Sequence, residues 1–434
     1  MEPSDHMETN RRRRRRRLVK TAVRGGVRDL VGKVRARGAS PEKRKEIEDR
    51  VHLKNAEEAA ATLGNMKGVV MKMGQMASFV AAVLPEEVQG QLSVLQQDAP
   101  PMTWELASAQ LESELGKPAE QAFAEIETEP AAAASIGQVH RARLDDGTEV
   151  AVKVQYPGVD AAIEADLANS DLLKMLLRRN APDVDLDPYV EEFRKRVTEE
   201  LDYTIEAAHQ REFADAWADF DDVVVPEVVM ATKRVLVTEW HDGARFSDVT
   251  ALPQSDRDRI GEILFRYVQR CVAQLAVFNG DPHPGNYIFL ADGRVVFLDF
   301  GCVKRLDSNA LQGQKMIARA IRAEDPAGLK SALVDAGYVQ PGSDASAEQI
   351  YDFIAGLNES VMEDRMFRHT KQSRVKAMRS LMSRSGPHAE VRKAVQVPGD
   401  LLFLMRVNAG LGALLGELEA EANWYRIYDE YWGD

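Results

Sequence analysis

Hydrophobic and polar positions alternate with a period of two in the middle of the chain. The alternation begins near residue 126 and forms two strand-like arms joined by Asp145-Asp146-Gly147, a composition typical of a tight hairpin turn. The second arm is the apolar run Val150–Val154, which a single polar residue, Lys153, interrupts. This region therefore predicts a β-sheet rather than helices.

The spacing is helical on both sides of this region. Residues 46–98 have helical periodicity, and after a double proline a second helix is predicted to run to about Leu115. A long helix is predicted within 187–219, and the chain is again helical beyond Gly301. Helices and strands thus occupy separate stretches, which indicates an α+β protein.

A second hairpin is predicted inside the C-terminal half. Tyr287–Leu290 and Val295–Leu298 alternate as strands do, and Ala291–Gly293 forms the turn between them. Asn286 precedes this hairpin and Asp299 follows it, so we expect an amide and a carboxylate close together at its open end.

Composition describes a large soluble protein. The 434 residues are 44% hydrophobic and 29% charged, and the length suggests two or three domains or lobes. The two cysteines, Cys271 and Cys302, exclude a disulfide framework and a cysteine-rich metal site. Both are expected to be small buried residues in a reducing compartment.

Positive charge is concentrated at the N-terminus. Residues 1–45 carry sixteen lysines and arginines against five acidic residues, a net +11 in a chain whose total is −13. Valines and a leucine recur at helical spacing between Val19 and Val34, after seven arginines. The segment fits either peripheral contact with an anionic membrane or a helix packed on the protein. Aromatic platforms and base-reading motifs are missing beside the arginines, so we expect no nucleic-acid partner.

No segment is predicted to span a membrane or to act as an export signal. The most apolar stretches are Leu63–Leu84 and Leu401–Leu418; lysines interrupt the first, and Arg406 and Asn408 interrupt the second. The N-terminal arginines are not followed by an apolar core. We therefore expect a cytoplasmic protein, with any membrane contact peripheral and at the inner face.

Three polar residues around the second hairpin have the spacing of a phosphoryl-transfer site. Asp281 precedes Asn286 by five positions, and Asp299 begins the tripeptide Asp299-Phe300-Gly301. This spacing is that of the lower, C-terminal half of the protein-kinase signature, without the His-Arg that usually precedes the first aspartate. An aspartate in the position of Asp281 orients or deprotonates the acceptor, while Asn286 and Asp299 offer hard oxygens to Mg²⁺.

The upper half of that signature is present in altered form. Lys153 lies in Val-Ala-Val-Lys, close to the strand lysine that pairs with ATP phosphates in kinases. Alanines replace the expected glycine-rich phosphate loop, and they restrict the backbone and add methyl groups where phosphates would approach. The residues expected to contact nucleotide here are Ala132, Ala133, Ala134, Ser135, Ile136 and Gly137.

A helix carboxylate is needed to hold Lys153. Asp202 and Glu206 are four residues apart and share a helix face, whereas Glu200 points elsewhere. Glu206 is preferred as the partner, although spacing alone leaves Glu200 open. Glu239 and Trp240 end a predicted strand where the adenine-binding hinge of a kinase would fall.

These pieces together resemble the UbiB family, the aarF-domain atypical kinases. The markers are Lys72-Met-Gly-Gln75, the alanine-rich stretch leading into Gln138-Val139-His140, Val-Ala-Val-Lys153, Glu200-Leu-Asp202, and Asp281-Pro-His-Pro-Gly-Asn286 with Asp299-Phe-Gly. The resemblance covers about residues 46–420. It implies a bilobal α+β protein-kinase-like fold with a helical N-terminal extension over the active-site cleft.

The resemblance also implies an activity. Family members bind ATP and Mg²⁺, act as ATPases more readily than as protein kinases, and support isoprenoid-quinone biosynthesis at membranes. Lys72 and Gln75 would then reach the covered site near Glu200 and Asp202. A lipid or quinone intermediate becomes the expected partner beside ATP, and the oligomeric state stays open.

The resemblance divides the chain into four segments and leaves two alternative functions open. Residues 1–45 form the basic arm, 46–125 the helical extension, 126–240 the N-lobe and 241–434 the helical C-lobe. A nucleotide-gated lipid-binding scaffold and a small-molecule phosphotransferase remain alternative functions. The Lys72–Gln75 segment and the alanine-rich loop argue against the phosphotransferase.

Overall fold

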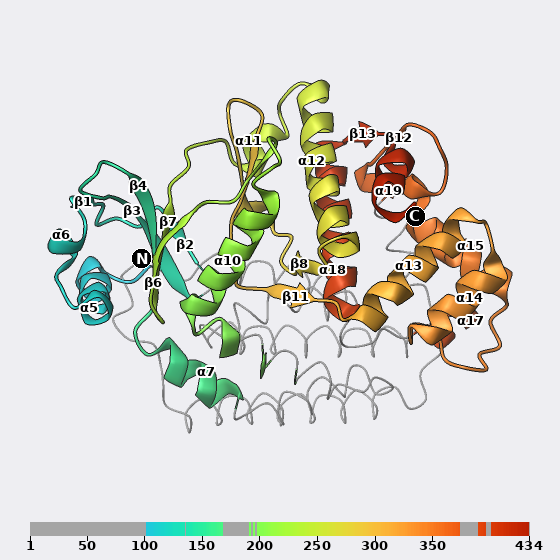
Figure 1. Ribbon diagram of the computed structural model, residues 1–434, viewed down its shortest axis with the longest axis horizontal. Coiled ribbons are helices and arrows are strands. Elements are labelled where there is room, and N and C mark those ends of the chain that lie inside the picture. Colours follow the sequence, from blue (N-terminus) through green and yellow to red (C-terminus); the bar gives the residue numbers. More distant parts are fainter. Residues whose placement is uncertain are drawn as a thin grey trace, which may run out of the picture. The chain divides into compact units, whose positions relative to one another are not determined.

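The computed structural model describes residues 101–134, 136–167, 198–373, 389–395 and 401–433, with three positions between 191 and 195 (Figure 1). The expectations for the arm, for residues 46–100 of the helical extension with Lys72 and Gln75, and for Ser135 lie outside the described residues. The chain divides into two compact units. The first is Met1–Ala207 with Val228–Trp240, and the second is Ala208–Glu227 with His241–Asp434.

The first unit is built on an antiparallel sheet whose described strands run in the order β1-β3-β4-β7-β6, with β2 paired to β3. The strands are β1 (Glu125–Ile126), β2 (Ala132–Ala133), β3 (Gly137–Arg143), β4 (Glu149–Gln155), β6 (Val228–Ala231) and β7 (Val235–Glu239). The predicted hairpin is β3–β4, and its turn glycine, Gly147, has a φ of +89°. Glycine adopts this conformation without steric cost.

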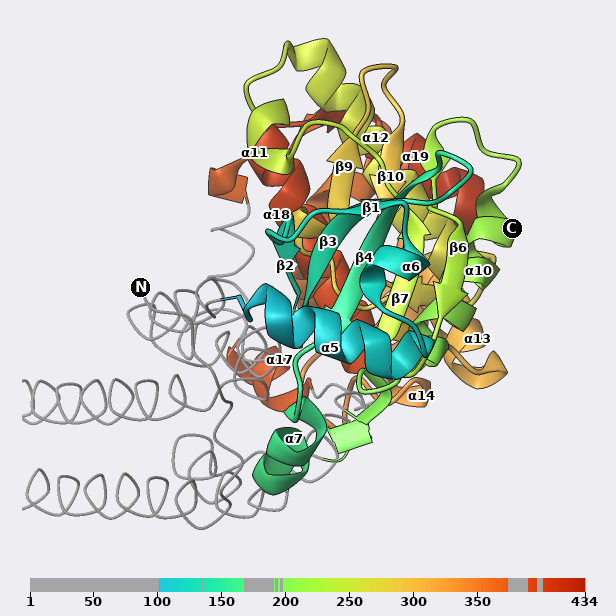
Figure 2. The same ribbon diagram turned by 90° about the vertical axis from the view of Figure 1, so that its left-hand side faces the viewer.

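The two faces of β4 have different neighbours. Val150, Val152 and Val154 alternate along one face and are fully buried, in a cluster that includes Ala107 and Leu111 of α5. Figure 2 shows α5 lying across the sheet. Because side chains alternate across a strand, Lys153 projects from the opposite face. The helices described in this unit are α5 (Trp104–Leu115), α6 (Ala119–Ala122), α7 (Val159–Leu167) and the start of α10 (Tyr203–Trp217).

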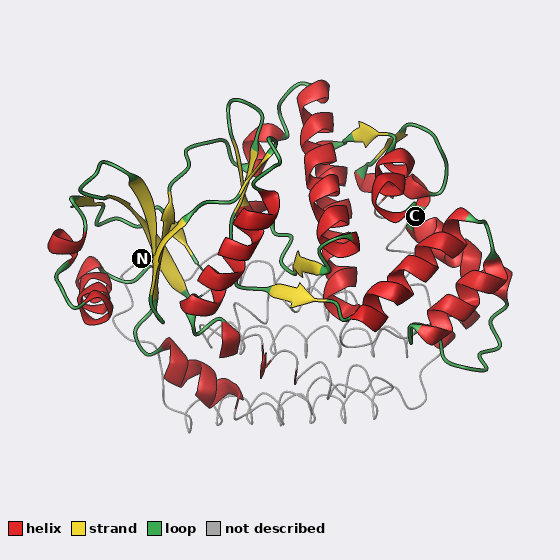
Figure 3. Ribbon diagram, viewed as in Figure 1, coloured by secondary structure: helices red, strands yellow, loops and turns green. Residues whose placement is uncertain are grey.

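The second unit is mainly helical (Figure 3). Its described helices are the rest of α10, α11 (Phe246–Val249), α12 (Gln254–Ala273), α13 (Ser308–Arg322), α14 (Pro326–Asp335), α15 (Ala347–Leu357), α17 (Ala389–Ala394), α18 (Leu402–Leu418) and α19 (Trp424–Trp432). Two 3-10 turns are η1 (Pro284–Asn286) and η2 (Glu359–Val361). The strands are β5 (Val223–Val224), β8 (Val277–Asn279), β9 (Tyr287–Phe289), β10 (Val295–Phe297), β11 (Val303–Arg305), β12 (Phe367–Arg368) and β13 (Glu421–Ala422).

Helix α12 is the centre of the second unit's core. It packs against α18 and α19, and more than half of its residues are buried. Its Tyr267 ring stacks on Phe297 of β10 with centroids 3.7 Å apart, and Trp217 also stacks on Tyr267, with centroids 4.8 Å apart. The helix therefore fixes β10, the strand that ends just before Asp299.

Two small sheets carry the polar residues singled out in the sequence. The predicted second hairpin is β9–β10, in which Tyr287 pairs with Phe297, and β5 runs parallel to β10. Strand β8 pairs antiparallel with β11, so that Asn279 faces Val303. This pairing brings the segment before Asp281 beside the segment after Asp299. In the described part of the chain, no helix is long and apolar enough to cross a membrane.

Candidate active site

Lys153 is held by Glu206 within the first unit. Its Nζ atom donates to Glu206 Oε1 at 2.7 Å and to Oε2 at 2.9 Å. The carboxylate side chain is 7% exposed and the lysine 17%, and Nζ also lies 4.9 Å from the ring centre of Tyr203. Both Glu206 and Tyr203 come from the first turn of α10. The strand lysine and a helix carboxylate are thus already paired within one unit.

The other two carboxylates of this region have different surroundings. Glu200 is buried, and its main-chain carbonyl accepts a hydrogen bond from Gln155 Nε2 at 3.3 Å. Asp202 immediately precedes α10, where its Oδ1 accepts the Thr204 N–H at 3.0 Å. That contact satisfies a main-chain donor of the first turn, as helix-capping side chains do. Asp202 therefore helps to fix where α10 begins, and with it the position of Glu206.

The alanine-rich segment is a strand rather than an open loop. Ala132 and Ala133 form β2, paired with Val139 and Gln138, and both are exposed. The Ala134 N–H donates to the Gly137 carbonyl at 2.9 Å, which closes a tight turn. Ile136 is 1% exposed and packs in the core, so among the described residues of 132–137 Ala132 and Ala133 are the exposed ones.

Gly137 is required by packing between strands. A Cβ atom there would lie 2.1 Å from the main-chain oxygen of Val154 on β4, a distance that atoms do not tolerate. Gly137, which the sequence predicts to contact nucleotide, thus also permits the close approach of β3 to β4.

A buried polar network anchors the chain just before α5 to β3. Gln138 Oε1 accepts the Met102 N–H at 2.9 Å, and Gln138 Nε2 lies 2.9 Å from His140 Nε2. His140 Nδ1 lies 2.8 Å from the Glu127 carbonyl, which can only accept, so Nδ1 carries the proton and Nε2 accepts from Gln138. Burial lowers the pKa of His140. Two markers of the family resemblance, Gln138 and His140, therefore serve an internal anchor.

Glu239 at the end of β7, and Trp240 after it, lie beside the start of β4. Glu239 pairs with Val150, and the Trp240 N–H donates to the Glu149 carbonyl at 3.0 Å. The Arg141 guanidinium lies 5.0 Å from the Trp240 ring centre and also donates to Glu149 at 2.7 Å. The ring predicted to border adenine is thus held from one side by a cation.

In the second unit, a single asparagine links two of the predicted site residues. Asn279 Oδ1 accepts the Asp281 N–H at 2.9 Å, and Asn279 Nδ2 donates to the main-chain carbonyl of Asp299. Asn286 Nδ2 in turn donates to the Asp281 carbonyl at 3.0 Å. Asp281, Asn286 and Asp299 are therefore brought together, and side-chain amides fix the main chain of the two aspartates.

Asp299 has a backbone conformation that is uncommon outside glycine. Its φ is +58°, and its Oδ1 accepts the Gly301 N–H at 3.0 Å. The following Phe300 is fully buried, 5.0 Å from the Phe213 ring, and its carbonyl lies 3.2 Å from His209 Nδ1. Residues in this region of conformational space cluster at functional sites, where the surroundings hold them in place.

The donor atoms suit Mg²⁺ bound together with another ligand. Asn286 and Asp299 are half-buried and carry hard oxygens. The amide nitrogen of Asn286 donates to Asp281, which leaves its amide oxygen for a metal. Among the described residues, no group of three or more His, Cys, Asp or Glu could hold a metal by itself. Mg²⁺ is commonly held by one or two protein oxygens, with waters and phosphates completing its coordination. The residues therefore fit Mg²⁺ that arrives with a phosphate.

Two residues at this site were not predicted from the sequence. Arg406 of α18 forms an ion pair with Asp281 in which the side chains are 10% and 4% exposed. Asn279 is the second, and its signal was a polar residue in an apolar strand. The signal for Arg406 was a lone cation in the apolar stretch Leu401–Leu418. In the sequence, this cation was taken only as a reason why the stretch does not span a membrane.

Comparisons with known proteins identify the family. The model of the ABC1 atypical kinase-like domain matches residues 94–332. The protein ACTIVITY OF BC1 COMPLEX KINASE 8 of Arabidopsis thaliana is 33% identical over 322 residues, 72% of this chain and 42% of its own length. AarF domain-containing protein kinase 1 of Gallus gallus is 27% identical over 392 residues, 87% of this chain and 73% of its own.

The matches extend to a solved structure. A Mycobacterium tuberculosis protein, solved in complex with erythromycin, aligns with a TM-score of 0.66 and 32% identity over 89% of this chain and 98% of that one. An uncharacterised Synechocystis protein is 36% identical over 259 residues. This chain spans 63% of the Synechocystis protein and 42% of the Arabidopsis protein named above. The α+β kinase-like fold predicted from the sequence is confirmed.

Proposed function

Since the chain belongs to the ABC1 atypical kinase-like family, we propose that it binds ATP together with Mg²⁺ and acts as an atypical kinase or ATPase. Asn286 and Asp299 would hold the metal, Lys153 would contact phosphate, and Asp281 would orient the acceptor hydroxyl or water. Bound Mg²⁺ would supply neutralisation of phosphate charge. Lys72 and Gln75 lie outside the described residues, and we propose, as expected from the sequence, that they reach the same site.

The observation that carries the proposal is the linkage of Asp281 to Asp299 through Asn279. One amide side chain fixes the main chain of both aspartates, and Asn286 fixes Asp281 from the other side. Positioning of this kind is the main contribution that a protein makes to phosphoryl transfer, because the reaction needs little covalent chemistry from the protein. Asp299 also has a positive φ, a conformation that is found at functional sites where the surrounding structure holds it in place.

Replacement of Asp299 by Asn tests the metal site. Asn adopts a positive φ as readily as Asp, so the backbone is preserved while a metal-binding charge is lost. Ligand that binds only the folded state stabilises it by about 2.7 kcal/mol at a hundredfold excess over the dissociation constant. We expect the parent to show a rise in melting temperature that needs both ATP and Mg²⁺, and Asp299→Asn to lose it.

The matched control is Asp292→Asn, which removes the same charge from the exposed turn of the same hairpin. This variant should keep the full Mg²⁺-dependent shift. An unchanged shift in Asp299→Asn would contradict the assignment of the site. Asp281→Asn should keep the Mg²⁺-dependent rise in melting temperature but should no longer release phosphate from ATP. This variant therefore separates phosphoryl transfer from nucleotide binding.

The proposal extends to isoprenoid-quinone or related lipid metabolism at a membrane surface. Its support is the family resemblance carried by the motifs around Lys153 and Asp281. Comparison of quinone intermediates in cells with and without the gene tests it. Identical intermediate profiles in the two strains would exclude this role.

A second candidate function is nucleotide-gated binding of a bulky hydrophobic ligand. It is favoured by the similarity to the mycobacterial protein solved with erythromycin, which extends over 89% of this chain. Erythromycin should then raise the melting temperature of the parent, and by a different amount when ATP and Mg²⁺ are present. A melting temperature unaffected by erythromycin under both conditions would remove macrolides from consideration.

A further inference from the structure

One face of α18 lies along the segment that contains Asp281. Phe403, Arg406 and Gly410 occupy positions i, i+3 and i+7 of this helix and therefore share one face. Each contacts a successive residue of the segment 280–282. The match to the family model ends at residue 332, so α18 lies outside it.

The first contact is close packing at Gly280. A Cβ atom on Gly280 would lie 2.9 Å from Phe403 Cδ1 and 3.1 Å from the Cys302 carbonyl. Phe403 is 1% exposed, and Lys304 Nζ lies 5.7 Å from its ring centre. The glycine is needed because the phenyl ring and Cys302 leave no room for a side chain.

The second contact is the ion pair of Arg406 with Asp281. The guanidinium Nη2 donates to Asp281 Oδ1, and the two side chains are 10% and 4% exposed. A carboxylate taken out of water costs free energy unless a cation and hydrogen bonds compensate it. Arg406 provides that compensation from a residue 125 positions away in the sequence.

The third contact fixes the distance between helix and loop. A Cβ atom on Gly410 would lie 2.2 Å from Pro282 Cγ, so only glycine permits this approach. Gly412, on the same helix, has nothing within 4 Å of such a Cβ atom. The chain thus offers a contacting and a non-contacting glycine two residues apart.

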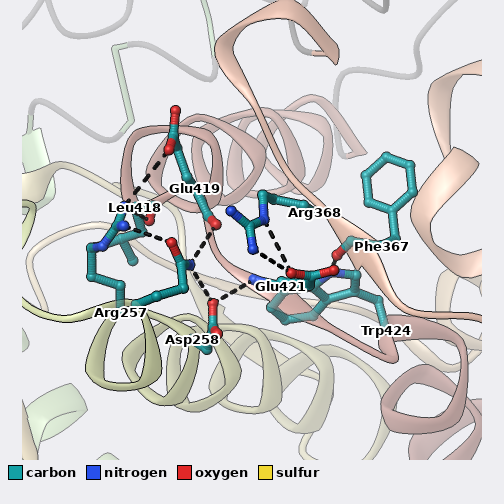
Figure 4. Close-up of polar contacts among 9 residues, drawn as sticks. Arg257, Asp258, Phe367, Arg368, Leu418, Glu419, Glu421 and Trp424 are labelled. Carbon is teal, nitrogen blue, oxygen red and sulfur yellow. Dashed lines mark hydrogen bonds and ion pairs between the residues drawn. The ribbon is translucent and has the colours of Figure 1, made fainter.

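The C-terminal end of α18 is fixed to α12 by a polar network (Figure 4). Arg257 Nη1 donates to the Leu418 carbonyl at 2.7 Å, and Asp258 Oδ1 accepts the Glu421 N–H at 2.7 Å. Arg368 adds an ion pair to Glu421. Since α12 leads directly into β8 and Asp281, one helix holds both the loop and the element that contacts it.

We propose that Arg406 is a positioning residue for phosphoryl transfer, and that α18 delivers it to Asp281. This rests on the proposed function. Arg406 fixes the rotamer of the Asp281 carboxylate through Oδ1, and the Phe403 and Gly410 contacts set the register that makes the ion pair possible. This one face of α18 therefore positions a residue of the proposed site, although the helix lies outside the matched domain.

The test measures ATP hydrolysis and Mg²⁺–ATP affinity separately in the full chain. Arg406→Gln should lower kcat at least tenfold and change the affinity by less than about twofold, because misplacement of a reacting group acts on the chemical step. Arg406→Lys keeps the charge without the planar fork and should recover part of kcat. In an Asp281→Asn background, Arg406→Gln should cause no further loss, because both changes affect one step.

A second pair of variants leaves every charge in place. Gly410→Ala should lower kcat by pushing α18 away from Pro282, whereas Gly412→Ala should leave kcat unchanged. Both gain the same helix propensity, so a difference between them reports the contact alone. This pair decides the matter if Arg406→Gln proves too unstable to purify.

Each outcome has a clear meaning. A parent chain without Mg²⁺–ATP binding contradicts the proposed function itself. A parent that hydrolyses ATP as well after Arg406→Gln, or faster, overturns the positioning role alone. Equal losses of kcat and affinity, or a further loss in the Asp281→Asn background, would show that Arg406 acts on the structure generally.

Discussion

Lys153 and Glu206 form an ion pair in which one ammonium contacts both carboxylate oxygens, at 2.7 and 2.9 Å. The pair joins the centre of the first unit's sheet to the first turns of α10. Further along that helix, in the second unit, His209 and Phe213 contact Phe300. In the first unit, α10 thus contacts Lys153 of the predicted kinase signature. In the second unit, it contacts Phe300, the residue that follows Asp299.

Breaking this ion pair from either side should be costly. Removal of one partner from a buried pair leaves a charge without compensation, which typically costs about 3–5 kcal/mol. We expect Lys153→Met and Glu206→Gln each to lower the free energy of unfolding by about 3 kcal/mol. The double variant should lose less than the sum, as measured by urea denaturation.

The control for this cycle is the exposed pair Arg141–Glu149, whose side chains are 28% and 49% exposed. Glu149→Gln should cost less than about 1 kcal/mol, because solvent screens exposed pairs. Additive losses in the Lys153 and Glu206 variants would mean that the two side chains are energetically independent.

Local pattern was enough to predict both hairpins. The turn at Asp145–Gly147 and the alternation around it give β3–β4, and Tyr287–Leu298 gives β9–β10. Helical spacing placed Glu206 and Asp202 on one face but left Glu200 open as the partner of Lys153. Spacing cannot resolve such a choice, because the strand that carries Lys153 approaches the helix only in the folded chain.

Tertiary contacts explain what the pattern could not supply. Arg406 reaches Asp281 across 125 positions, and nothing near either residue in the sequence encodes that meeting. The alanine-rich stretch was interpreted as a loop, yet Ala132 and Ala133 pair with β3 as a short strand. Alanine is a weak strand former, so pairing with an adjacent strong strand decided its conformation.

Gly137→Ala should destabilise the first unit. The added Cβ would lie 2.1 Å from the Val154 oxygen, and the two strands must separate to relieve it. Strain of this kind typically costs about 1–3 kcal/mol. Thermal unfolding in the absence of nucleotide measures the effect; a variant as stable as the parent would show that β3 and β4 separate at little cost.

The exposed alanines of β2 should restrain the bound phosphates. Ala132→Gly and Ala133→Gly relax the backbone where kinases use glycine, and each should change nucleotide affinity or autophosphorylation. The readouts are isothermal titration with Mg²⁺–ATP and incorporation of labelled phosphate. If both variants match the parent in both assays, β2 has only a structural role.

The basic N-terminal residues should hold the protein at anionic membranes. Residues 1–45 carry a net +11 in an otherwise acidic chain, and attraction to anionic headgroups contributes about 1 kcal/mol per basic residue near the surface. The full chain should co-sediment with anionic liposomes at low salt, dissociate as salt rises, and not bind neutral liposomes. A variant lacking residues 1–37 that still pellets would place the contact elsewhere.

His369 should make the protein less stable in acid. Burial lowers its pKa to about 4, its Nε2 has no hydrogen-bond partner among the described residues, and its ring contacts Phe367 and Trp424. The unfolded chain binds the proton near pH 6.5, so acid favours unfolding; stability is unaffected above about pH 7 and falls by up to about 3 kcal/mol toward pH 4. In urea denaturation from pH 7 to 5, His369→Phe should show a smaller decline than the parent, because no proton is taken up at this position. Equal declines in the two proteins would assign the acid sensitivity to other groups, with His140 the first to examine.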